Sequence, residues 1–210
     1  MRQPHSFDRI TKIKFKPNEN VLFTCGEDGC FKSWILRENR QQASSSETTF
    51  NWIYNTCNGF RDMIPTDVEF VSFNSSIDLV AVSFNHITTI WVYNEHEGVI
   101  FLNDLIHCDP NDFIRQIKFI NNDHLLVMHE KFLNLWSIND TTDQKFLMKC
   151  KWSGQYENIL YMCENPSDKS QIILLMNESL NSIDDDNKIS IQSNSKNIKF
   201  NFKIFNYYYH

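Results

Sequence analysis

The segment Leu22–Leu36 reads LFTCGEDGCFKSWIL, which is two strand-like runs separated by Gly26-Glu-Asp-Gly29. Glycine and aspartate tolerate the positive φ angles that a tight hairpin turn needs. The second run carries a large aromatic ring, Trp34, near its end. The segment therefore predicts an antiparallel β-hairpin, and the same pattern recurs further along the chain.

Three copies of this pattern are present, each made of three short strand-like runs with polar turn residues between them. They span residues 10–37, 67–94 and 112–139. A tryptophan lies in the third run of each copy: Trp34, Trp91 and Trp136. A phenylalanine ends each first run, namely Phe15, Phe73 and Phe119, and stands 19, 18 and 17 residues before its tryptophan. We predict that these residues, with the turn residue Asp28, hold equivalent structural positions in one repeated unit.

A fourth strand-like run follows each tryptophan, at residues 50–54, 99–102 and 145–152. Runs rich in β-branched and aromatic residues are typical of antiparallel strands. The second and third tryptophans are 45 residues apart, close to the roughly 40–45 residues of a four-stranded propeller blade. A Ser-rich insertion at residues 41–49 lengthens the first spacing to 57. The sequence therefore predicts an all-β, WD-repeat β-propeller.

Blades are expected at about residues 8–57, 66–105 and 112–152, with a degenerate fourth at 156–184 in which Ile183 replaces tryptophan. Residues 1–184 then form a partial propeller, and 185–210 read as a low-complexity or frayed tail. Closed propellers have roughly 4–8 blades, and open sheet edges promote aggregation. We therefore expect three to four blades of a larger, seven-bladed propeller, in a fragment or truncated gene product. The alternative is that its edges pair with another chain.

The charge balance bears on possible partners. The 210 residues contain 20 Lys and Arg against 26 Asp and Glu, for a net charge of −6. Binding nucleic acid through its phosphates requires a basic excess, so any RNA contact is expected through a complex. The N-terminus lacks the apolar core of a secretory signal, and no run of about 18 apolar residues suggests a membrane span.

The motif Cys25-Gly-Glu-Asp-Gly-Cys30 is the most suggestive local pattern. We interpret it as a structural thiol pair facing across the turn, with a regulatory disulfide or a metal site as alternatives. Zinc needs about four ligands, and no second Cys or His pair has suitable spacing. The acidic run at residues 184–186 lacks the glycine and distal glutamate of an EF-hand loop. No metal or cofactor is predicted.

Catalytic signatures are absent from the sequence. It contains no HExxH, GxSxG, Walker loop or GxGxxG pattern, and those patterns carry the residues that the corresponding reactions need. A hydrolase built on a propeller would need carboxylates converging in its channel. We therefore predict no enzyme, no catalytic residues and no small-molecule substrate.

Two of the repeats also resemble a known family. The segment TCGEDGCFKSWIL (residues 24–36), the isolated Trp52, the Cys57-Asn-Gly-Phe loop and LVAVSFNHITTIW (residues 79–91) are similar to the Nan-one/WD-repeat-seventy-five family. Members of that family are subunits of the UtpA (t-UTP) subcomplex of the small-subunit processome. The resemblance is strongest over residues 22–91. No tryptophan of the repeats is followed by aspartate, so the WD signature is degenerate.

This resemblance implies a non-catalytic scaffold of ribosome biogenesis, located in the nucleus and nucleolus. It implies a part in pre-rRNA processing toward small-subunit rRNA, and in some organisms in rDNA transcription. The implied partners are the other UtpA subunits and processome proteins, with pre-rRNA bound through the complex. The family's chain is longer and has two propellers, and this sequence looks like part of the second. The alternative is an adaptor in an unrelated complex, such as a ubiquitin ligase receptor or a trafficking coat.

Overall fold

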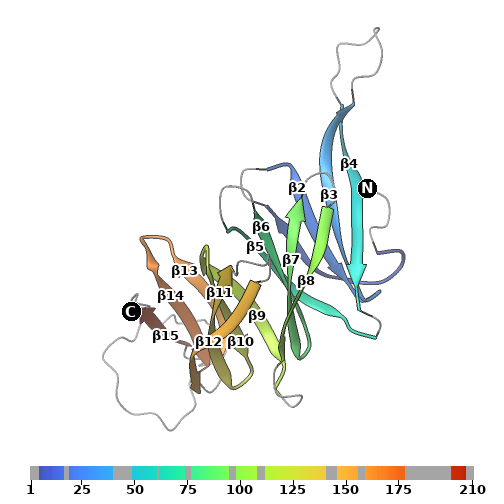
Figure 1. The fold of residues 1–210 in the computed structure, drawn as a ribbon. Helices are drawn as coiled ribbons and strands as arrows, with labels where there is room; N and C mark the ends of the chain where they lie inside the picture. Colours follow the sequence, from blue (N-terminus) through green and yellow to red (C-terminus); the bar gives the residue numbers. More distant parts are fainter. Residues whose placement is uncertain are drawn as a thin grey trace, which may run out of the picture.

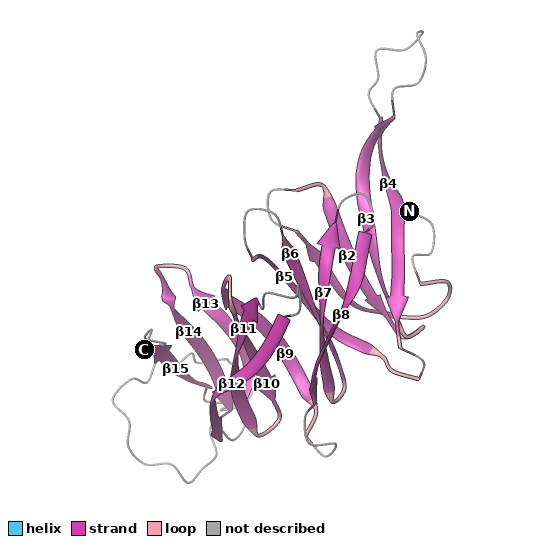
Figure 2. Ribbon diagram, in the orientation of Figure 1, coloured by secondary structure: helices cyan, strands magenta, loops and turns pink. Residues whose placement is uncertain are grey.

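The computed structural model describes residues 5–16, 19–39, 49–60, 62–73, 77–94, 98–107, 112–140, 146–155, 159–177 and 200–206. The regular structure in these ranges consists of β-strands (Figure 2). Within the same ranges there is no helix long and apolar enough to cross a membrane.

The strands form four consecutive sheets. Blade 1 contains β1 (Ile10–Phe15), β2 (Val21–Gly26), β3 (Cys30–Asn39) and β4 (Thr49–Gly59). Blade 2 contains β5 (Pro65–Ser72), β6 (Asp78–Phe84), β7 (Ile87–Asn94) and β8 (Gly98–His107). Blade 3 contains β9 (Ile114–Asn121), β10 (His124–His129), β11 (Phe132–Asp140) and β12 (Phe146–Gln155). Blade 4 contains β13 (Ile159–Asn165), β14 (Asp168–Asn177) and β15 (Phe200–Asn206).

Neighbouring strands within each sheet are antiparallel and follow chain order. The sheets succeed one another from the N-terminal to the C-terminal end of the chain (Figure 1). The first strands of the blades lie side by side, because β5 contacts both β1 and β9, and β9 contacts β13. This meander of antiparallel blades around adjacent first strands confirms the predicted all-β propeller architecture.

Blade 4 departs from the expected pattern. Its third strand was expected before Asp184, around Ile183, which lies outside the described residues. The structure instead pairs β14 with β15, from Asn177 opposite Phe200 to Gln171 opposite Asn206. The expectation of a frayed tail therefore does not hold for residues 200–206. Their sequence FNFKIFN alternates apolar and polar residues as a strand does, a signal that a search based on tryptophan spacing misses.

The strand registers correct one repeat position. Trp34 pairs with Leu22, Trp91 with Val80 and Trp136 with Leu125. The first-strand partners of those second-strand residues are Phe15, Phe70 and Phe119. Phe70, rather than Phe73, is therefore the equivalent of Phe15.

The physical reason is the length of one hairpin. After Phe70, β5 and β6 continue for two more pairs, from Val71 opposite Leu79 to Ser72 opposite Asp78. Phe73 lies beyond the end of β5, where its N–H donates to the Ile77 carbonyl. The prediction of Phe73 rests on its distance in sequence from Trp91, which is comparable between repeats only if their hairpins have similar lengths. The longer β5–β6 hairpin places the equivalent residue, Phe70, three positions earlier.

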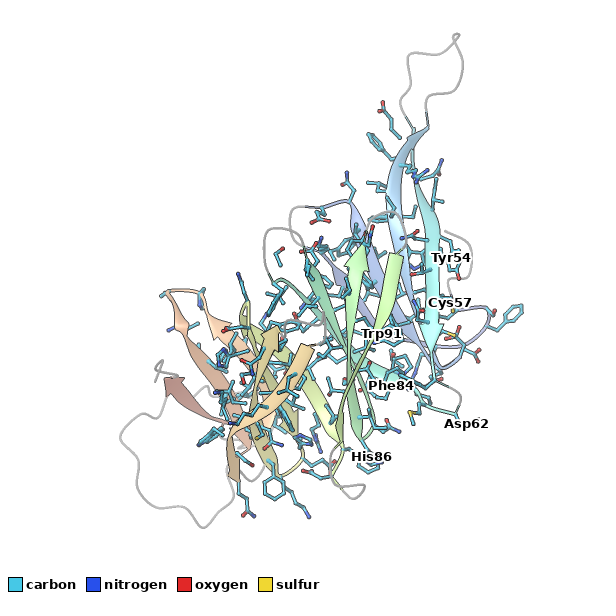
Figure 3. The ribbon with its side chains drawn as sticks, viewed as in Figure 1. Tyr54, Cys57, Asp62, Phe84, His86 and Trp91 are labelled. Atoms are coloured by element: carbon cyan, nitrogen blue, oxygen red, sulfur yellow. The ribbon has the colours of Figure 1, made fainter. Side chains whose placement is uncertain are left out.

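Apolar side chains fill the spaces between blades. Phe23 and Phe31 of blade 1 share one core cluster with Phe84 and Trp91 of blade 2. The rings of Phe31 and Trp91 meet edge to face at 4.9 Å between centroids, an arrangement that aromatic pairs prefer. A second cluster joins blades 2 and 3, and a third joins blades 3 and 4. Trp91 and Trp136 thus each pack toward the preceding blade, and Figure 3 shows Trp91 between the first two sheets.

Polar groups also join the blades along their first strands. Asp67 of β5 is buried, and its carboxylate accepts hydrogen bonds from the backbone N–H groups of Val68 at 2.9 Å and Ile117 at 3.0 Å. The Lys12 ammonium of blade 1 lies 2.9 Å from the same carboxylate. In the next layer, Glu69 pairs with Lys14 of blade 1. One carboxylate, Asp67, therefore bonds to three blades.

Candidate interaction surface

A buried hydrogen-bond network lies on the face of blade 1 that points away from blade 2. His5 Nδ1 is 2.7 Å from the Asp28 carboxylate, and His5 Nε2 is 2.8 Å from the Thr24 hydroxyl. Trp34 Nε1 donates to the same hydroxyl at 2.9 Å. Because an ionised carboxylate only accepts, His5 Nδ1 donates to Asp28. The network thus links the chain before β1 to the second and third strands.

The turn between β2 and β3 is shaped for this network. Gly29 has a φ of 80°, as the hairpin prediction expects. A Cβ on Gly26 would lie 2.3 Å from His5 Nδ1, so only glycine leaves room for the imidazole. Burial acts to raise the pKa of Asp28, but hydrogen bonds from Lys32 and His5 outweigh it and hold the pKa below its usual range. Asp28 is therefore ionised and fixed in place.

Sequence reasoning identified Trp34 and Asp28 as repeat positions but missed His5 and Thr24. A signal for Thr24 was present in the sequence. Thr24 lies two residues after Leu22, the partner of Trp34, and shares its strand face. The other two repeats have valine at the position of Thr24. His5 had no such signal, because its position depends on how the chain before β1 folds over the blade.

The network is reduced in the following blades. Val82 and Val127 stand where Thr24 stands in blade 1. In blade 2, Trp91 Nε1 finds another acceptor, the Thr89 hydroxyl at 2.7 Å. In blade 3, Trp136 Nε1 is buried and has no hydrogen-bond partner among the described residues. Blade 3 therefore lacks a hydrogen-bond acceptor for Trp136, and a single substitution can supply one.

We expect Val127→Thr to raise the free energy of unfolding by about 1 kcal/mol, because the new hydroxyl accepts from the unpaired Trp136 N–H. The matched control is Val82→Thr, an equally buried position whose tryptophan is already bonded to Thr89. That change adds a buried hydroxyl without pairing a donor and lowers the free energy by about 1–2 kcal/mol. Urea unfolding of both variants measures the difference, and equal losses would contradict the assigned register.

The same face of blade 1 exposes a row of apolar side chains. The registers place Ile13 and Phe15 of β1 on the side of Trp34, together with Trp52 of β4. The Phe15 and Trp52 rings lie 6.0 Å apart between centroids. Phe15 is 59% exposed, whereas its equivalents are covered by the preceding blade and are 8% (Phe70) and 5% (Phe119) exposed.

We call this surface the open face, defined by side chains that share the orientation of Trp34: Ile13, Phe15, Cys30, Phe50, Trp52, Tyr54 and Cys57. It has the composition of a blade-to-blade contact without the covering blade. Exposed apolar patches of this kind mark sites of protein contact. The open face is therefore the candidate interaction surface.

The cysteine motif is arranged differently from the expectation. Cys25 and Cys30 do not face each other across the turn, because Cys25 points into the core shared with blade 2 and Cys30 lies on the open face. Alternate strand residues point to opposite faces, and Cys25 pairs with Phe31, not with Cys30. The neighbour of Cys30 is Cys57 of β4, to which it hydrogen-bonds through its side chain. The prediction that Cys25 and Cys30 form a thiol pair is therefore wrong.

Other site classes find little support in the described part of the chain. It contains no cluster of three or more His, Cys, Asp or Glu side chains that could hold a metal ion. The acidic run at residues 184–186 lies outside the described residues. The remaining chemistry is that of blade contacts, buried polar bridges and free thiols.

Comparison with known proteins defines the family. A family model described as WD repeat-containing protein 75 second beta-propeller matches residues 1–121, which include all of blades 1 and 2. The chain belongs to this family. WD repeat-containing protein 75 of Xenopus laevis is 31% identical over 125 residues, a match that covers 57% of the chain and 14% of the relative. The family resemblance noted from the repeats is confirmed.

Two further similarities concern the propeller itself. A family model described as Rrn6, beta-propeller, matches residues 76–204, overlapping the range of the WD repeat-containing protein 75 family and extending into the last strand of blade 4. A crystal structure of a protein from Lactobacillus plantarum aligns with a TM-score of 0.56 at 12% identity, covering 80% of this chain and 48% of the other. At that identity the likeness supports the fold alone.

Proposed function

We propose that the chain is a non-catalytic scaffold module of ribosome biogenesis that acts in pre-rRNA processing toward small-subunit rRNA. Membership of the WD repeat-containing protein 75 family carries this proposal. In it, the module works in the nucleolus within the UtpA subcomplex of the small-subunit processome. Support for rDNA transcription is a further part of the same role.

The mechanism is assembly. Blades locked together by apolar clusters and by Asp67 form a rigid support, and the open face presents apolar side chains in a fixed arrangement. The equivalent faces of blades 2 and 3 are covered by a β-sheet, so the open face fits a further apolar sheet. A net charge of −6 opposes direct phosphate binding, so pre-rRNA is held through neighbouring proteins.

The test is depletion of the protein in its own cells, followed by hybridisation with probes for the 5′ external transcribed spacer. We expect unprocessed precursor to accumulate and mature small-subunit rRNA to fall. The tagged protein should co-purify with that precursor and with processome subunits. Normal processing after depletion would refute the proposal, and partners recovered without RNA would favour an adaptor in another complex. Labelling of nascent transcripts separates a loss of transcription from a loss of processing.

A further inference from the structure

Two thiols meet on the open face of blade 1. The β3–β4 register pairs Cys30 with Gly59 and Lys32 with Cys57, so the two cysteines occupy diagonal positions on one side of the sheet. Gly59 presents no side chain opposite Cys30, because a Cβ there would lie 2.3 Å from the Gly29 carbonyl oxygen. The two thiols hydrogen-bond to each other, and Cys57 also hydrogen-bonds to Tyr54. Cys57 and Tyr54 are labelled on β4 in Figure 3.

This pair is reachable from solvent. Cys57 is exposed and Cys30 is half-buried, and both line a cavity of about 750 Å³ between the β2–β3 turn and the β4–β5 connection. Cys25, by contrast, is fully buried, and its thiol lies in the core between blades 1 and 2. Cys150 is exposed, but its thiol bonds to the Trp152 carbonyl. The cavity admits a small thiol reagent to Cys30 and Cys57 together.

We propose that Cys30 and Cys57 form a redox-active dithiol that closes reversibly to a disulfide between β3 and β4, with a low-molecular-weight disulfide such as glutathione disulfide as oxidant. The exposed Cys57 thiolate attacks one sulfur of the oxidant, forms a mixed disulfide and releases one thiol. The Cys30 thiolate then attacks the Cys57 sulfur, and the second thiol leaves. The protein dithiol loses two electrons and two protons, and the oxidant becomes two thiols.

The surroundings set the character of this bond. Diagonal cross-strand neighbours lie just beyond the usual Cα separation of a disulfide, so closure requires the two strands to move together. Strained or exposed disulfides are the readily reduced ones, which suits a reversible reaction. Burial and the hydrogen bond that the Cys30 thiol donates to Cys57 raise the pKa of Cys30 to about 11. Only a small fraction of Cys30 is thiolate at neutral pH, so the closing step is slow there.

Closure alters the proposed contact surface. Tyr54 and Trp34 pack edge to face at 5.5 Å beside the thiol pair, and a bulge separates their register from that of Cys57. Drawing β3 and β4 together at Cys30 therefore shifts the aromatic part of the open face. The inference concerns this chain's thiols and does not depend on the role in ribosome biogenesis.

The experiment equilibrates the whole reduced chain in buffers of decreasing glutathione to glutathione disulfide ratio, then traps free thiols and maps the peptides by mass spectrometry. We expect one internal disulfide between the Cys30 and Cys57 peptides, reversed by added glutathione. Cys30→Ser should instead accumulate glutathione on Cys57. Cys150→Ser, which removes an exposed cysteine on β12, should oxidise as the unaltered chain does.

Two results would overturn the proposal. One is stable glutathionylation of Cys57 in the unaltered chain without closure, which would show that the thiols cannot reach each other. The other is a disulfide that joins different cysteines while Cys30 and Cys57 remain free. Thermal unfolding of each variant verifies its fold, and Cys57→Ser, at an exposed position, provides a second variant if Cys30→Ser is unstable.

Discussion

Asp67→Ala is expected to lower the free energy of unfolding by about 3 kcal/mol, because it leaves buried backbone donors without an acceptor. The carboxylate accepts from the N–H groups of Val68 and Ile117 and pairs with the Lys12 ammonium. Burial alone would lower the pKa of Lys12, and the charge of Asp67 raises it above its usual range. Removing Asp67 therefore disconnects three blades at a single point.

A short series separates these contributions in urea unfolding. Asp67→Asn keeps the volume and one acceptor oxygen, so we expect a loss between zero and that of the alanine variant. The control is Asp123→Ala, whose side chain is 54% exposed and whose loss should stay within about 0.5 kcal/mol. A loss at Asp67 no larger than that of the control would show that the inter-blade bridge does not stabilise the fold.

The second large effect concerns the open face. In the purified chain no other protein covers it, so we expect concentration-dependent self-association through this surface. Ile13→Asp combined with Phe15→Asp places two charges on the face and should weaken association by about a hundredfold, or 2.7 kcal/mol. Both side chains are exposed, at 52% and 59%, so folding should change little. Sedimentation velocity over a range of concentrations measures the effect.

Leu147→Asp is the matched control, since Leu147 is a strand residue of blade 3 with a similar exposed fraction, 54%. It should leave association unchanged if the open face is responsible. Equal effects of the two variants would mean that association arises from general exposure of apolar residues. Unchanged association in the Ile13 and Phe15 variant would remove the open face as an interaction surface.

Part of the fold could be predicted because its signals are local. The turn at Gly26–Gly29 and the alternating runs around the tryptophans depend on residues close together in the chain. The predicted strands of blades 1–3 are accordingly present, although all three fourth strands are longer than expected. The position of Phe73 could not be predicted in the same way, because hairpin length depends on how many pairs β5 and β6 form, and either length fits the sequence.

The candidate site shows more strongly that local features could be predicted from the sequence and tertiary contacts could not. Trp34 stood out in the sequence because bulky aromatics recur at blade positions, but His5 acquires its role only when the chain before β1 folds onto Thr24 and Asp28. Asp67 looked like an ordinary polar strand residue, yet Ile117, 50 residues away, lies against it. Contacts between blades depend on the packing of whole sheets, which no short segment encodes.

For this protein, the sequence by itself determined the repeated antiparallel blade, because strand alternation, turn glycines and tryptophan spacing are all local. The resemblance of residues 22–91 indicated the family. Only the tertiary structure decided which groups meet. It showed that Cys30 lies beside Cys57 and not beside Cys25. The alternation of side chains along the hairpin places Cys25 in the core, and the pairing of β3 with β4 places Cys57 next to Cys30. It also left Phe15 exposed where Phe70 and Phe119 are buried, since burial depends on whether another sheet lies against the face.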